Sequence, residues 1–289
     1  MESKQKLFDR NALRRNRTRA SQALPAHDFL FADTSQQILD RLNVVKHTFP
    51  RILDLGCHTG HVKKLISPKH GTECFISCDP SAAMARAAGT HSIVADEEDL
   101  PFADQSLDLI LSALSLHWVN DLPRALAQIL RCLRPNGLFM AAMFGGNTLS
   151  DLRQSLISAD NSRSKNVFPR VSPFVEIQEF GNLVQRIGFA MPVIDVDHIT
   201  VAYPNLKTLM TDIRGMGEAN SVNARCKHFT PRAIIQKAAA FYPPCTDGST
   251  EHIHAKFEVL YVMGWAPHPE QQQPLRRGTG KGKLEQVLG

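Results

Sequence analysis

The segment Arg51–His61 (RILDLGCHTGH) constrains the fold of this chain more than any other. It starts as a short apolar run typical of a buried strand, passes through a turn bounded by Gly56 and Gly60, and continues into a helix. Asp54 lies near the carboxyl end of that strand, where open α/β sheets bind ligands. The glycines let backbone approach a ligand, and the helix N-terminus would offer N–H groups. The segment predicts a ligand-binding turn; a tight turn without a ligand is the alternative.

Strand and helix patterns alternate on both sides of residue 100, which is typical of a parallel sheet with crossover helices. After the strand at 51–55, further strands are expected at 74–78, 91–95, 107–113 and 138–144. A helix ending at Gly188 is followed by expected strands at 193–201 and 256–263. The pattern predicts an α/β protein with helices on both faces of one sheet.

Composition divides the chain into three regions. Residues 1–27 form a basic arm with a short helix expected at 8–19, and residues 28–265 form one domain. That domain has insertions at about 145–172 and 203–250, the second with helices at 205–218 and 231–241. Residues 266–289 are rich in Pro, Gln, Gly and Lys and predict a disordered tail.

The net charge of +5 comes from the ends of the chain. Without residues 1–20 and 270–289, the 33 basic and 28 acidic residues fall to 22 and 24. This balance argues against a nucleic-acid-binding core. The basic ends would make at most peripheral contact with an anionic membrane, or contact a partner; a solvated arm is the simpler expectation. The sequence has neither an apolar run of about 18 residues nor the apolar core of a secretory signal.

The six cysteines lack the spacing of a disulfide framework, so reduced thiols and a cytosol-like compartment are expected. Glu251, His252 and His254 are the tightest group of potential iron ligands. Alternating histidines on a strand are commonly surface residues, and we therefore predict no metal site.

The turn at 54–60 resembles motif I (Asp-x-Gly-x-Gly-x-Gly) of the class I S-adenosylmethionine (SAM) dependent methyltransferases, with His58 replacing the middle glycine. The resemblance implies SAM as cofactor and a Rossmann-like seven-stranded sheet, parallel except for one strand. A ring at His58 that intruded on the methionine moiety of SAM would weaken its binding.

Two more acidic segments continue this resemblance. Asp79 follows the second strand in DPSAAM, where a carboxylate can accept ribose hydroxyls; an N-cap role is the alternative. Asp96 begins DEEDLPF, which resembles the segment that binds the adenine amino group. The resemblance thus places SAM against Asp54, Gly56, Cys57, Gly60, Asp79, Pro80, Met84, Asp96, Glu97, Ser112 and Leu114.

The segment after the fourth strand is expected to face the substrate that accepts the methyl group, here called the acceptor side. It lacks the Asn/Asp-Pro-Pro-Tyr sequence of enzymes that methylate nucleic-acid amines, and has His117 and Trp118 instead. His117 is a candidate general base or substrate-orienting group, with a structural histidine as the alternative. Trp118 would pack over the cofactor or contact the substrate.

The run SLHWVNDLPRAL resembles two related groups: malonyl-acyl-carrier-protein methyltransferases and mitochondrial complex I assembly factors that hydroxylate an arginine. The segments FDRN (8–11), AMFGGNTL (142–149) and RGMGEAN (214–220) favour the second group. That resemblance implies hydroxylation, or methylation, of an arginine on a complex I subunit. Arg214 and Glu218 would bind the substrate, since Glu218 suits a guanidinium.

Two other functions remain open. The chain would be a conventional methyltransferase acting on a small or carrier-bound carboxylate, or a non-catalytic assembly chaperone. The expected location is a bacterial cytoplasm, with the mitochondrial matrix, peripheral to the inner membrane, as the alternative.

Overall fold

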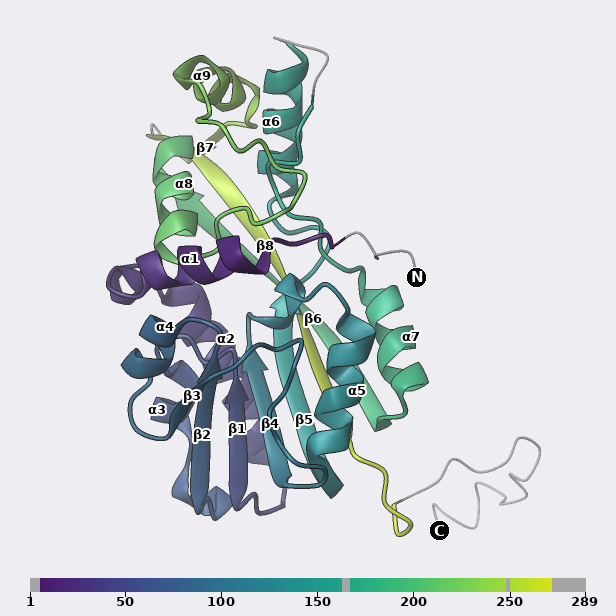
Figure 1. The fold of residues 1–289 in the computed structure, drawn as a ribbon. Coiled ribbons are helices and arrows are strands. Elements are labelled where there is room, and N and C mark those ends of the chain that lie inside the picture. The colour runs from purple at the N-terminus through teal and green to yellow at the C-terminus, as the bar shows by residue number, and fades with distance from the viewer. Residues whose placement is uncertain (1–5, 163–166, 248–249, 272–289) are drawn as a thin grey trace, which may run out of the picture.

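The computed structural model describes residues 6–162, 167–247 and 250–271. Its centre is one sheet with the strand order β3-β2-β1-β4-β5-β8-β6 (Figure 1). Only β8 runs antiparallel to its neighbours, so the predicted seven-stranded sheet with one reversed strand is confirmed. The strands are β1 (Arg51–Leu55), β2 (Cys74–Asp79), β3 (Ser92–Val94), β4 (Leu107–Ala113), β5 (Leu133–Phe144), β6 (Ala190–Tyr203) and β8 (Thr250–Trp265); β7 (Cys245–Asp247) pairs only with β8.

Helices cover both faces of the sheet, as predicted, and each face has its own apolar core. One core includes residues of α2 (Phe29–Val44), α3 (His61–Leu65) and α4 (Ala82–Ala87), and the other lies beneath α5 (Leu122–Cys132) and α7 (Ile177–Ile187). Beyond the strand ends, α6 (Ser150–Asn161), α8 (Leu206–Gly215) and α9 (Arg232–Phe241) surround the extended part of β8 (Figure 1).

Local sequence explains where these helices begin and end. Asp121 caps α5 by accepting from the Arg124 amide, and Pro123 stands in its first turn, where a missing N–H costs nothing. The apolar residues of α5 recur on one face, so Ala125 and Ile129 are fully buried. At the other end of the domain, α7 stops at Gly188, whose φ of 104° suits a left-handed C-cap.

Two expectations about the strands need correction. The strand expected at 138–144 begins earlier, at Leu133. Asn136 within it adopts φ 62°, and the pairing with β4 shifts register between Leu133 and Leu138. The last strand begins at Thr250 and pairs with β7, which was not predicted. His252 and His254 therefore lie within β8 and do not precede it.

The expectation of a solvated N-terminal arm is wrong. Its predicted helix is present as α1 (Arg10–Ala20), and it lies across the carboxyl ends of the parallel strands (Figure 1). Leu13 and Arg17 are fully buried, and the Phe8 ring packs edge-on against Trp118 at 5.3 Å. This packing and the ion pairs of its arginines hold the arm against the strand ends. Most of the predicted disordered tail, residues 272–289, lies outside the described residues.

None of the helices in the described ranges is long and apolar enough to cross a bilayer.

Candidate functional site

The turn after β1 requires glycine at both positions singled out in the sequence. Gly56 and Gly60 have φ of 71° and 80°, which L-residues rarely adopt. A Cβ on Gly56 would lie 2.0 Å from Ser115 Oγ, and one on Gly60 would lie 3.1 Å from the Ala88 Cα. The turn is therefore packed tightly between the end of β4 and α4, and Cys57 is buried within it.

Asp79 ends β2 as a fully buried carboxylate beside this turn. Its Oδ1 accepts from the Ser81 amide at 2.8 Å, and its Oδ2 accepts from the His58 amide at 3.2 Å and Arg17 Nη1 at 3.1 Å. The N-cap of α4 is Ser81, whose side chain accepts from the Met84 amide. Ser81, and not Asp79, therefore caps α4. The alternative interpretation of Asp79 as an N-cap does not apply. Pro80 and Met84 are buried next to it.

Asp96 and Glu97 follow β3 and are bound by Arg10 of α1. Arg10 Nη2 donates to Asp96 Oδ1 at 2.6 Å, and its Nε donates to Asp96 Oδ2 at 3.3 Å. The same guanidinium contacts Glu97, which also accepts from Ser115 Oγ and from Arg17 Nη1. Burial raises the pKa of Glu97, but the charges of Arg10 and Arg17 outweigh it and leave this pKa at about 2.

Arg17 is the centre of the cluster. Its side chain has 0% exposure, and its guanidinium binds Asp79, Glu97 and Ser115, the last at 2.8 Å through Nη2. The acids predicted to hold the cofactor ribose and adenine are therefore joined to α1. Sequence reasoning missed Arg10, Arg17 and Ser115. The FDRN segment was the available signal, because it places Arg10 in a family-like motif within a basic arm.

Asp54 is the unusual acid of the site. It is buried, and neither of its oxygens has a hydrogen-bond partner among the residues that the structure describes. Burial, followed by the charge of Asp79, raises the pKa of Asp54 to about 8. Ser112 Oγ, near the end of β4, is likewise buried and without a described partner. Unsatisfied polar groups of this kind are rare in native proteins and commonly mark functional positions.

His58 does not extend into solvent. Its ring packs on Phe31 of α2 at 4.4 Å between centroids, and its Nε2 lies 3.3 Å from the carbonyl oxygen of Leu114. Both His58 and Leu114 have left-handed backbones, with φ of 47° and 51°. Such strain in non-glycine residues is held by the surrounding packing and clusters at functional sites. Burial and the nearby Arg17 charge lower the pKa of His58 well below its usual value, so the ring is neutral.

Three residues predicted for the acceptor side do come together. His117 Nε2 and Trp118 Nε1 lie 2.9 and 2.7 Å from the same oxygen of Glu218, Oε2. The other oxygen of Glu218 and Nδ1 of His117 are buried, and within the described ranges neither has a partner. Arg214 is not part of this group, because it is exposed at the end of α8.

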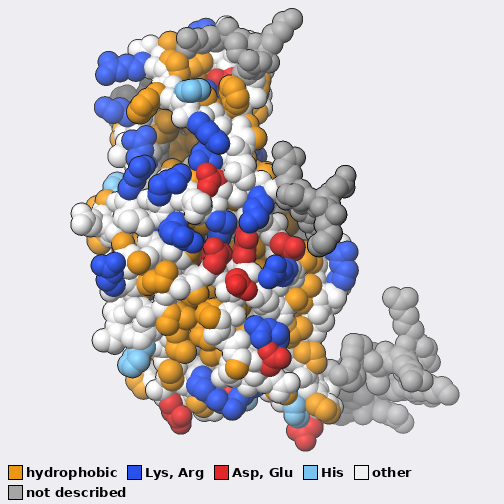
Figure 2. Space-filling model, viewed as in Figure 1, with side chains coloured by type: hydrophobic (Ala, Val, Ile, Leu, Met, Phe, Trp, Pro, Cys, Tyr) orange, Lys and Arg blue, Asp and Glu red, His pale blue; other side chains and the backbone are white. Residues whose placement is uncertain are grey.

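A hollow of about 590 Å³ adjoins His117, and Phe8, Met143, Phe174 and Arg186 are among the residues that line it. The His117 ring also contacts the rings of Phe144 and Phe174, at 4.8 and 5.5 Å. At the level of α1, Lys and Arg side chains gather next to acidic ones across the middle of the face in Figure 2. The face thus combines an apolar recess with paired charges. Such a surface suits a side chain that has an apolar stem and a charged end.

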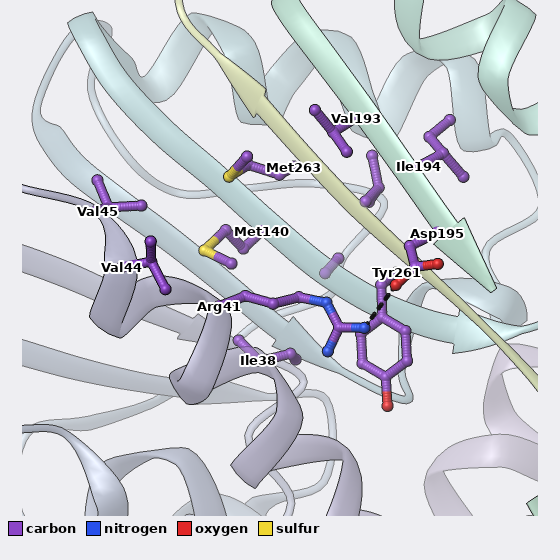
Figure 3. Close-up of a pocket in the computed structure, with 12 residues that line it drawn as sticks. Ile38, Arg41, Val44, Val45, Met140, Val193, Ile194, Asp195, Tyr261 and Met263 are labelled. Carbon is purple, nitrogen blue, oxygen red and sulfur yellow. Dashed lines mark hydrogen bonds and ion pairs between the residues drawn. The ribbon is translucent and has the colours of Figure 1, made fainter. Parts of the chain in front are cut away.

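A second hollow, of about 490 Å³, lies between α2 and the strands β5, β6 and β8 (Figure 3). Arg41 stacks on the Tyr261 ring at 4.1 Å there and donates to Asp195 at 2.7 Å. Its lining residues include none of the carboxylates described above. We therefore place the site at the strand ends beneath α1.

Comparison with known proteins identifies the family of this chain. Residues 53–141, which contain the turn and all three acidic strand ends, match a family model described as a methyltransferase domain. The chain is 38% identical to the arginine-hydroxylase NDUFAF5, mitochondrial, of Danio rerio, over 94% of this chain and 87% of that protein. It is 31% identical to the malonyl-[acyl-carrier protein] O-methyltransferase of Methylovorus sp., over 93% of each. Among solved structures, a Bacillus halodurans protein described as a putative methyltransferase shares the fold, with a TM-score of 0.55 and 11% identity over 82% of this chain and 100% of that one.

Proposed function

Since this chain belongs to the superfamily of SAM-dependent methyltransferases, we propose that it uses SAM in modifying an arginine side chain of a protein partner, a complex I subunit. The observation that supports this proposal most is the carboxylate of Glu218. Its Oε2 lies 2.9 Å from His117 Nε2, and its Oε1 is buried with no partner among the described residues, so it could accept from a guanidinium. The relatives named arginine-hydroxylase suggest the reaction, and the motif resemblance implies the complex I subunit as partner.

The residues present fit SAM, the cofactor of the superfamily. SAM carries a sulfonium and an ammonium group. The oxygens of Asp54 have no partner within the described ranges, and a cation beside them would offset the cost of burying that carboxylate. Asp79 would accept the ribose hydroxyls and Asp96 the adenine amino group, as the resemblance implies. When bound, SAM supplies a methyl group activated by the positive sulfur. Arg10 and Arg17 form ion pairs with Asp96 and Asp79, so these guanidiniums would compete with SAM for the two acids.

Glu218 and His117 would receive the substrate arginine. In the His117 tautomer that donates from Nε2 to Glu218 Oε2, Nδ1 carries the lone pair of the ring and can accept a proton. Methylation would join the SAM methyl carbon to a guanidinium nitrogen, break the carbon–sulfur bond and release one proton to a base such as His117. Hydroxylation would insert one atom of dioxygen into a C–H bond, with two electrons and two protons from a reductant converting the other to water.

We expect His117→Gln to lower product formation by about 10²–10⁴-fold, the usual loss when a general base is removed. SAM affinity should not change, because His117 contacts Glu218 and aromatic rings and not the cofactor acids. Initial rates and SAM titration on the same preparations separate the two effects. His47→Gln, at an exposed position, is the matched control. A His117→Gln enzyme of full activity would leave this residue with a structural role only.

The function itself is tested by incubating the protein with SAM, a reductant, air and purified complex I subunits of its organism, and then mapping modified peptides by mass spectrometry. The proposal predicts one added oxygen, or one added CH₂, on an arginine. Methyl transfer to a malonyl thioester would favour the carboxyl O-methyltransferase instead, as the 31% identical relative suggests. A bound subunit with neither modification would favour an assembly chaperone.

A further inference from the structure

A group of potential metal ligands lies at the junction of β7 and β8, away from the acids beneath α1. Cys245 is the direct cross-strand partner of His252, and His254 follows two residues later on the same face of β8. One ligand atom from each of these three residues lies within 4.8 Å of the other two. All three side chains are half-buried. The sequence predicted no metal here, because alternating histidines on a strand are commonly surface residues. The pairing of β7 with β8 brings Cys245 to them.

We propose that Cys245, His252 and His254 form a zinc-binding site. Zinc–nitrogen bonds of about 2.0–2.1 Å in a tetrahedral site set two imidazole nitrogens about 3.3 Å apart. His252 Nε2 and His254 Nε2 lie 3.1 Å from one another, so the pair already has nearly the required separation. Two ring nitrogens at this distance need a proton or a cation between them, because their lone pairs would otherwise repel.

The backbone holds the ligands in place before any ion binds. His254 pairs with Ala202 of β6, and its carbonyl oxygen accepts from the Tyr242 hydroxyl at 2.9 Å. Cys245 and His252 are fixed by the β7–β8 register. The ligands therefore come from a hairpin whose strands are paired, and little chain entropy would be lost on binding.

The donor set narrows the choice of ion. One thiolate and two imidazoles suit zinc or copper, whereas calcium, magnesium and manganese prefer oxygen ligands. A non-haem iron oxygenase site would need a carboxylate where this group has the Cys245 thiolate. Three protein ligands leave one position of a tetrahedral ion for water or for a ligand from a partner. β7 lies near α9, beyond α8 from the parallel strand ends (Figure 1). This position favours a role in stabilising the β7–β8 hairpin over a role in the chemistry beneath α1.

The test is titration of the untagged, metal-free protein with Co²⁺, followed by Zn²⁺. We expect a stoichiometric thiolate-to-cobalt charge-transfer band that Zn²⁺ abolishes, together with a Zn²⁺-dependent rise in melting temperature. Cys245→Ser should remove the band and weaken Zn²⁺ binding by more than about 100-fold, since even the loss of an outer-shell partner costs about 10–100-fold.

Cys226→Ser is the matched control, because Cys226 is also half-buried but lies outside the group, with its Sγ near the His228 carbonyl. That variant should bind both ions as the wild type does. His254→Ala, checked for folding by circular dichroism, should also lose the band. A wild type without the band, or a Cys245→Ser variant that keeps it, would overturn the proposal.

Discussion

Replacing Arg17 by Gln should make SAM bind at least about tenfold more tightly while making the cofactor-free protein less stable. Arg17 is fully buried and forms ion pairs with two carboxylates. Removing one partner of a buried ion pair typically lowers the free energy of unfolding by about 3–5 kcal/mol. The same substitution frees Asp79 and Glu97 from the guanidinium that now engages them. Calorimetric titration with SAM and urea unfolding at pH 7 measure the two effects on one preparation.

Arg14→Gln is the matched control, since Arg14 is exposed on the same helix and the substitution is chemically identical. It should change neither property appreciably, because isolated surface charges contribute little. If Arg17→Gln bound SAM more weakly than the wild type, Arg17 would be part of the cofactor pocket. The view that α1 covers the acids in competition with SAM would then be wrong.

Asp54→Asn should stabilise the cofactor-free protein at pH 8, and this advantage should vanish toward pH 4. The folded-state pKa of Asp54 is about 8 and its ordinary value is 3.8, so between these pH values the native state holds a proton that the unfolded state has released. Stability of the wild type therefore falls as pH rises through this window. A shift of this size corresponds to a few kcal/mol at pH 8, and the neutral Asn avoids it.

Urea unfolding from pH 4 to pH 9 without SAM gives the two curves to compare. Asp104→Asn is the control, because Asp104 is largely exposed and, among the residues that the structure describes, pairs with the surface residue Arg131. Its curve should run parallel to that of the wild type. An Asp54→Asn curve that also runs parallel would mean that Asp54 is ionised or paired in the folded protein.

The strand ends were predictable because each follows a local rule. The glycine-bounded turn and the acids after β2 and β3 lie within single strand–turn units, whose apolar runs and turn residues are read directly from the sequence. His117 and Glu218 were assigned separately to the acceptor side, Glu218 through motif resemblance, and the structure brings the two within 2.9 Å.

What the sequence did not predict depends on contacts between distant segments. Arg17 meets Asp79 across 62 residues, and nothing in a basic helix says which of its arginines will be buried. Cys245 meets the two histidines only through a three-residue strand too short to show a pattern. Arg214 is exposed because of the way α8 is oriented. Helical spacing in the sequence does not tell which face of the helix will point toward the site.

The most direct test of this account is calorimetric titration of SAM into the wild type and into Asp79→Asn. Asp79 lies among the acidic strand ends and accepts three hydrogen bonds there. The account predicts saturable binding to the wild type, weakened by about 10²–10³-fold in the variant, the loss expected for two hydrogen bonds to a charged group. Equal binding by both proteins, or none by a folded wild type, would contradict it.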